Sequence, residues 1–290
     1  MFKLDKRYSL LFLLIAAASA NAGGGNVRWR GPNQPVYVVT HNHYAEGFSP
    51  SGQTARFGDL IMIEIFNPKA PPPDQSAGYK VGGRYALFMG GERRGDVKVK
   101  KVVPLQCDSS AAKVSTHPAV HLSTSTMALA TNADGIRPHL NMQRNADETE
   151  RAYARQLTIE EFRKHGVPDR LAKNLHIGNL VVTEVENHGP KVLIGSLSIK
   201  ANGARHEIFL IGRVTSSTPA TELARYHKTT DLEDGKDSQN VQFVDQLDLD
   251  NDGIDEVVTE VTGYESEGFE IYKRQNGLWR RVWVGGQGGC

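Results

Sequence analysis

A dense group of carboxylates near the C-terminus is the clearest chemical signal in the chain. Residues 248–256 have the sequence DLDNDGIDE, which holds five carboxylates within nine positions. Like charges a few ångströms apart repel by about 1 kcal/mol per pair even in water. A hard divalent cation removes this repulsion, and oxygen ligands at alternate positions suit Ca²⁺. Gly253 can adopt the positive φ that a loop around an ion requires. We therefore expect a calcium site; the alternative is a solvated acidic turn that binds nothing specific.

The segment also resembles a known family. Residues 243–258 (FVDQLDLDNDGIDEVV) are similar to the calcium loop of FG-GAP/VCBS-type repeats, whose pattern is D-x-[DN]-x-D-G-x-x-[DE] before a short apolar strand. The resemblance implies that Asp255 points outward or acts behind the ligands. It implies a ligand set of three side chains, one backbone carbonyl and a closing acid: Asp248, Asp250, Asp252, Ile254 and Glu256.

Two features limit this resemblance. An EF-hand loop needs a bidentate Glu at its twelfth position, and Thr259 stands there instead. A β-propeller needs several blades, but the chain contains one good copy of the loop, within roughly its last 50 residues. We therefore expect a single calcium-binding β unit.

The segments around the loop have the pattern of β-strands. Residues 256–262 and 268–273 alternate polar and apolar side chains, and residues 278–284 return after the hairpin signal Asn276-Gly277. Together with residues 241–244 they predict a four-stranded antiparallel meander. Such a meander has too little core to stand alone, so it should pack on the preceding region. The expected core residues are Val257, Phe269, Ile271 and Trp279.

A histidine pair is the chain's only catalytic-looking feature. His41 and His43 follow a strand-like segment, and a His-x-His pair at a strand end can chelate zinc in metallohydrolases. No further ligands nearby complete such a site, since Glu46 stands where an Asp-His pair is expected. We favour two loop histidines with ordinary hydrogen bonds, and keep metal ligation or general-base chemistry as the alternative.

The N-terminus predicts export. A basic stretch precedes an apolar run over residues 10–18 and the small-residue cleavage site Ala20-Asn21-Ala22, which is typical of a signal peptide. No later segment is apolar enough to span a bilayer, so we expect a periplasmic or secreted protein without a stable membrane anchor. Removal of residues 1–22 changes the net charge from +1 to near −1. This balance gives no reason to expect nucleic-acid binding.

Two cysteines fit an oxidising compartment. Cys107 and Cys290 are an even pair in an exported protein and predict one disulfide. Closing so long a loop would stabilise the fold by about 4 to 5 kcal/mol in the chain-entropy model. Two free thiols or an intermolecular bond are the alternatives.

The remainder of the chain predicts an α+β fold. Segments at residues 36–40, 60–66, 85–89, 180–185, 192–200 and 205–214 are strand-like. The valine–lysine alternation of residues 96–103 indicates a solvated strand face or a protected sheet edge. Residues 147–156 favour a helix, Thr158 begins a second short helix through a capping box, and a third follows Pro168.

We therefore predict an α+β protein of mostly antiparallel β-sheet with a few short helices. The expected parts are a signal peptide (1–22), an α+β domain (23–225) and a calcium-binding β unit (226–290). The expected function is a non-catalytic module with one structural Ca²⁺ that binds a protein or glycan outside the cytoplasm. The alternatives are a metal-dependent hydrolase using His41 and His43, and an exported inhibitor or ligand carrier.

Overall fold

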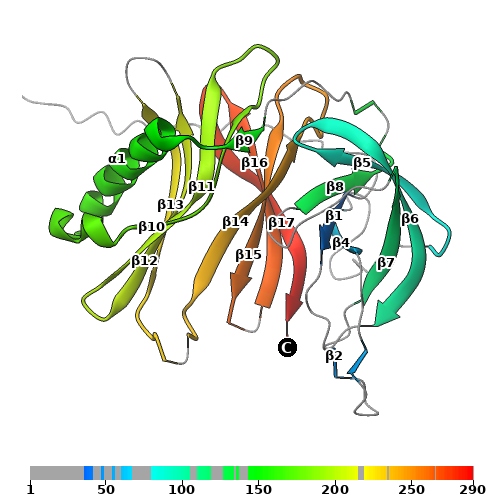
Figure 1. Cartoon of the computed structure of the whole chain (residues 1–290), viewed down its shortest axis with the longest axis horizontal. Coiled ribbons are helices and arrows are strands. Elements are labelled where there is room, and N and C mark those ends of the chain that lie inside the picture. The colour runs from blue at the N-terminus through cyan, green and yellow to red at the C-terminus, as the bar shows by residue number, and fades with distance from the viewer. Residues whose placement is uncertain are drawn as a thin grey trace, which may run out of the picture.

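The computed structural model is built mainly from antiparallel β-sheets (Figure 1). It describes residues 36–41, 47–48, 54–55, 60–66, 80–104, 110–118, 127–133, 135–136, 143–214, 219–233, 235–264 and 266–289. Within these residues there is a single α-helix and a 3₁₀ helix, η1 (Asp169–Asn174). The predicted fold class is confirmed in this respect, since every strand pair in the described residues is antiparallel.

The first strands form a closed barrel in the order β1-β4-β7-β6-β5-β8. Their bounds are β1 (Val36–His41), β4 (Leu60–Phe66), β5 (Arg84–Met89), β6 (Glu92–Pro104), β7 (Ser110–His117) and β8 (Met127–Thr131). Alternate side chains fill the interior, among them Val97, Val99 and Val114. A separate two-stranded ribbon joins β2 (Gly47–Phe48) to β3 (Thr54–Ala55).

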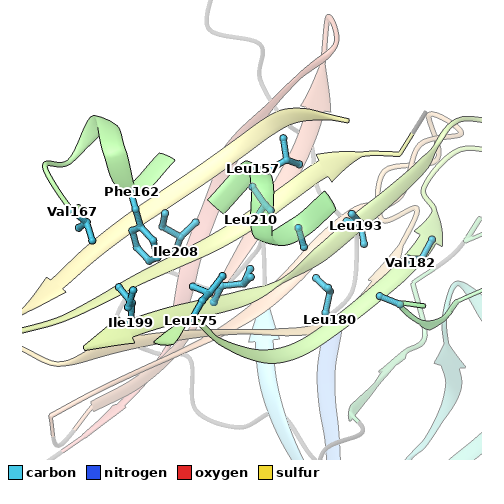
Figure 2. Packing of buried hydrophobic residues seen from close by; sticks show 13 residues of the cluster. Leu157, Phe162, Val167, Leu175, Leu180, Val182, Leu193, Ile199, Ile208 and Leu210 are labelled. Atoms are coloured by element: carbon cyan, nitrogen blue, oxygen red, sulfur yellow. The ribbon is translucent and has the colours of Figure 1, made fainter. Parts of the chain in front are cut away.

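A five-stranded sheet follows in the order β13-β12-β11-β10-β9. Its strands are β9 (Arg144–Asn145), β10 (His176–Glu184), β11 (Lys191–Ala201), β12 (Ala204–Arg213) and β13 (Ala220–Thr229). Helix α1 (Glu148–Lys164) lies across one face, where Leu157 and Phe162 pack against Leu193, Ile208 and Leu210 (Figure 2). Burying a side chain of this size contributes about 1.5 to 3 kcal/mol relative to leaving it exposed.

Helix α1 replaces the two short helices expected from sequence. Its N-cap is Asp147, whose side chain accepts from the Glu150 backbone N–H while the Glu150 side chain accepts from the Asp147 N–H. The predicted capping box at Thr158 was wrong, because Thr158 is fully buried within the continuous helix. Sheet packing at Leu157 and Phe162 extends the helix through the second cap-like sequence.

The last four strands form the predicted C-terminal meander, which we call the central sheet. Its order is β14 (Gln239–Leu247), β15 (Glu256–Gly263), β16 (Ser266–Gln275) and β17 (Leu278–Gly289). Val257, Phe269, Ile271 and Trp279 are all buried, as expected.

The central sheet lies between the two other parts of the molecule (Figure 1). One face packs on the five-stranded sheet, with Val257 and Tyr272 against Phe209. The opposite face packs on the outside of the barrel, with Val258 against Phe88. The doubled valine in β15 therefore covers both faces, which explains why the strand departs from simple alternation there.

The predictions for residues 96–103 and for the domain boundary can also be compared with the structure. Residues 96–103 lie in β6, which pairs with β5 and β7, so the alternative of a protected sheet edge is wrong. The other alternative, a solvated strand face, agrees with the exposure of Lys100 and Lys101. The predicted boundary between residues 225 and 226 falls inside β13, and the domain division stays a prediction. Within the described residues, no helix has the length and apolar character needed to cross a bilayer.

Leu157→Ala should weaken the helix–sheet packing. Leu157 is 2 % exposed, so truncation removes buried methyl groups and leaves a cavity, which costs about 2 to 5 kcal/mol. Urea unfolding measures the loss. The exposed Arg155→Ala on the same helix is the matched control and should change the free energy of unfolding by less than about 0.5 kcal/mol. Equal effects of the two changes would contradict the packing.

Candidate metal centre

The acidic segment connects two neighbouring strands of the central sheet. β14 ends at Leu247 and β15 begins at Glu256, so residues 248–255 form the loop between them. The Asp255 N–H donates to the Val185 carbonyl at 2.7 Å, and Ile254 forms an isolated bridge with Glu186. The loop is therefore anchored to the turn between β10 and β11.

The loop backbone is held by its own carboxylates. Asp248 accepts from the N–H groups of Asp252 at 3.1 Å and Gly253 at 2.9 Å. Asp252 accepts from the Ile254 N–H at 3.0 Å. Asn251 and Gly253 have positive φ values of 61° and 89°, which the tight wrap of the chain requires.

Three carboxylates converge on one point. One oxygen each from Asp248, Asp250 and Glu256 lies within 4.8 Å of the others. The second Glu256 oxygen accepts from the Leu249 N–H at 2.8 Å, which fixes the orientation of that carboxylate. Two oxygens up to 4.8 Å apart can each lie 2.3 to 2.6 Å from a Ca²⁺ ion bound between them. The donor set and its spacing therefore fit a hard divalent cation.

A lysine ammonium lies among these carboxylates. Lys273 Nζ, from β16, donates to Asp250 and Glu256 at 2.8 Å and to Asp252 at 2.7 Å. Lys273 is only 6 % exposed. Burial acts to lower its pKa, but Glu256, Asp250 and Asp252 outweigh that effect and hold the pKa above its usual value. The protein thus supplies one positive charge of its own at this position.

Negative charge still exceeds positive charge around the loop. Burial raises the pKa of Glu256 to about 8; Asp250 repels the carboxylate further, while Lys273 opposes both effects. Burial likewise raises the pKa of Asp248. The hydrogen bonds from the backbone N–H groups of Gly253 and Asp252 offset only part of this effect. A single ammonium does not balance several carboxylates, so the most buried of them are hard to ionise. A divalent cation would favour their ionised forms.

Two further buried acids lie behind the loop. Burial raises the pKa of Asp255 to about 9, and repulsion from Asp248, Asp245 and Glu256 adds to the effect. Burial also raises the pKa of Asp245 to about 8. Both Asp245 oxygens accept from the Gly90 N–H, at 2.9 and 3.1 Å, in the tight turn between β5 and β6. Asp245 therefore ties the central sheet directly to the barrel.

The structure brings together most of the ligands expected from sequence. Asp248, Asp250 and Glu256 form the cluster, and Asp252 reaches it through the shared contact with Lys273. Ile254 is half-buried at the end of the loop. Of the two alternatives expected for Asp255, the outward orientation is excluded, since its exposure is 0 %, and a position behind the ligands remains. The hydrogen bond from its backbone N–H to the Val185 carbonyl holds residue 255 against the turn between β10 and β11.

Sequence reasoning missed Lys273, although a signal was present. Phe269 and Ile271 alternate with polar residues in β16 and face the barrel side of the central sheet. Lys273 follows at the next position of the same alternation, where an inward side chain is expected. A lysine at an inward position requires an anionic partner, and the acidic loop, which precedes β16 by the single strand β15, supplies one.

The other predicted sites lie at or beyond the limits of the described residues. His41 is the last residue of β1, and His43 falls outside the described residues. Cys107 and Cys290 also fall outside them, as does the signal peptide over residues 1–22. The histidine site, the disulfide and export therefore stay predictions.

Comparison with known proteins adds no relative. No protein-family model, curated protein or solved structure matches the chain. The resemblance to the FG-GAP/VCBS loop therefore stays a prediction, and the geometry of the acidic loop carries the functional argument.

The neutral form of Asp255 should make stability depend on pH. An unfolded Asp has a pKa of about 3.9, whereas burial raises the pKa of Asp255 to about 9. Between these values the folded state keeps a proton that the unfolded state has released. In chelator, the free energy of unfolding should therefore fall as pH rises, by up to about 1.4 kcal/mol per pH unit for this group, and level off above the folded pKa.

Urea unfolding from pH 6 to 9.5 tests this dependence. Asp255→Asn should show a shallower slope than the wild-type protein, because the amide does not titrate. The exposed Glu233→Gln serves as the control and should keep the wild-type slope. An Asp255→Asn slope equal to that of wild type would contradict a protonated Asp255.

Proposed function

We propose that residues 248–256 bind Ca²⁺ and that the protein is an exported, non-catalytic binding module stabilised by this ion. The convergence of oxygens from Asp248, Asp250 and Glu256 within 4.8 Å carries the proposal. Asp252 and the Ile254 carbonyl complete the ligand set that the FG-GAP/VCBS resemblance implies.

The ion would take the place of the Lys273 ammonium. Lys273 Nζ lies 2.7 to 2.8 Å from three carboxylate oxygens, and Ca²⁺ ligands lie at 2.3 to 2.6 Å. A shift of a few tenths of an ångström thus converts an ammonium site into a calcium site, once the lysine withdraws. Because Ca²⁺ carries two charges, it also offsets more of the negative charge that one ammonium leaves uncompensated.

The role of the ion follows from the position of the loop. The loop joins β14 to β15, and these strands contact both the five-stranded sheet and the barrel. A ligand that binds only the folded state stabilises it by mass action. The basic and apolar N-terminal residues are typical of an exported chain. Extracellular modules use calcium sites with dissociation constants of about 0.1 to 1 mM.

Calcium should raise the thermal stability of the wild-type protein. At 10 mM Ca²⁺ a site of this affinity adds about 1.4 to 2.7 kcal/mol relative to chelator, which corresponds to a rise of roughly 3 to 10 °C in Tm for a chain of this size. Asp250→Ala should lose the rise, because it removes one converging oxygen.

The control is an acidic residue away from the loop. Glu233→Ala should retain the full calcium-dependent rise, since Glu233 is an exposed residue in the turn before β14. If calcium shifts neither the wild type nor Glu233→Ala, the loop is an acidic turn neutralised by Lys273 alone. Zinc in the purified protein, with activity lost in His41→Ala, would instead favour the hydrolase alternative.

Lys273→Met should increase calcium affinity while weakening the calcium-free protein. Methionine preserves the bulk of the side chain but removes the competing charge, so we expect calcium to bind about tenfold more tightly or better. Without calcium, the carboxylates lose their cation and Tm should fall. Titration calorimetry gives the affinity, and melts in chelator give the stability.

The exposed Lys200→Met is the matched control and should alter neither quantity. Calcium affinity that is unchanged or lost in Lys273→Met would contradict exchange between the ammonium and the ion. If Lys273→Met folds only in the presence of calcium, this would support exchange between the ammonium and the ion, because the ion would then replace the missing positive charge.

A further inference from the structure

Strand β6 presents lysines to solvent from the middle of the barrel wall. Val97 and Val99 point into the barrel and are 0 % exposed, so the intervening Lys98 points outward. The register of β6 against β7 shifts between Val99 and Lys101. This bulge leaves two consecutive lysines, Lys100 and Lys101, both exposed.

The neighbouring strands add like charges opposite these lysines. Arg84 of β5 pairs directly with Lys98, and Lys113 of β7 pairs directly with Lys101. Like charges at opposed positions destabilise a sheet. Lys113 makes an interaction of its own and does not belong to this group. We call the outward surface formed by the exposed Arg84, Lys100 and Lys101 and the half-buried Lys98 the basic face.

Two structural explanations for these cations do not apply. Lysines protect exposed sheet edges from pairing with other chains, but β6 lies between β5 and β7 in a closed barrel. Internal ion pairing also fails, because no described carboxylate forms an ion pair with a residue of the basic face. The nearby acids Asp96 and Glu92 are instead paired with Arg93 at 2.7 Å and Arg94 at 2.6 Å.

We propose that the basic face binds an acidic polysaccharide. Cations on adjacent strands lie about 4.8 Å apart, and alternate residues along one strand about 6.6 Å apart. These intervals suit the repeated sulfate or carboxylate groups of an extended sugar chain. Ser115 and His117 continue the outward side of β7, opposite Lys98 and Asp96, and offer hydrogen-bonding groups to sugar hydroxyls.

The surroundings disfavour other polyanions. Single-stranded nucleic acids bind through aromatic stacking, whereas Tyr85 packs on the barrel core and Phe88 on the central sheet. A lipid surface requires inserted apolar side chains, and within residues 80–102 Val81, just before β5, is the one large apolar side chain that is exposed. With a net charge of only +1, the chain concentrates positive charge on this face without becoming basic as a whole.

Heparin is the probe for the test, with the full mature chain. Surface plasmon resonance on immobilised heparin compares wild type with Lys98→Gln/Lys100→Gln/Lys101→Gln. The matched control is Lys173→Gln/Lys200→Gln/Lys228→Gln, which removes the same charge elsewhere. We expect wild type to bind with an affinity that falls steeply with salt, the barrel triple variant to bind at least tenfold more weakly, and the control to stay within twofold of wild type.

Three outcomes would overturn the proposal. These are no binding of wild type at low salt, equal weakening of both triple variants, or tighter binding to single-stranded DNA or anionic vesicles of matched charge. A melt of each variant in the same buffer establishes folding. Because all the substituted lysines are solvent-accessible, loss of heparin binding with an unchanged Tm would support the basic face. Calcium and chelator should give the same heparin affinity, so this result is independent of the calcium proposal.

Discussion

The charge balance between Lys273 and the acidic loop is the constraint on which the centre of this protein depends. The loop joins β14 to β15, and Lys273 reaches it from β16, so three adjacent strands meet at one group of charges. A buried charge is tolerated only when it is paired and hydrogen-bonded. The ammonium meets that requirement for three carboxylates, and it does so only when β16 is in its native register beside β15.

The central sheet transmits this constraint to the rest of the molecule. Its two faces pack on different partners, so a shift of its strands would disturb both hydrophobic clusters. Polar contacts reinforce the same arrangement. Asp245 accepts a hydrogen bond from the Gly90 N–H of the barrel, and Asp255 donates its own N–H to Val185 in the turn between β10 and β11. The acidic loop thus holds the Lys273 ammonium, and the loop and the adjacent end of β14 lie where three parts of the chain meet.

Opposite charges are segregated within a nearly neutral chain. Carboxylates collect at the centre, where burial strengthens their interaction with a cation, and lysines collect on the outer wall of the barrel. The net charge of +1 conceals this separation. The two regions also differ in what they can bind, because a buried cluster of oxygens suits a small ion, whereas an open row of ammonium groups suits an extended anion.

The sequence by itself determined the local features. Alternating apolar residues and the Asn276-Gly277 turn fixed the C-terminal meander, and the spacing of acids about Gly253 identified the loop. Only the tertiary structure decided what surrounds them. The burial of Asp255, the insertion of Lys273 and the place of β6 inside a barrel depend on which strands become neighbours. Helix α1 likewise continues through Thr158 because the sheet packs against Leu157 and Phe162. Short-range patterns encode backbone conformation, whereas the partner of a buried charge is set by contacts between residues distant in sequence.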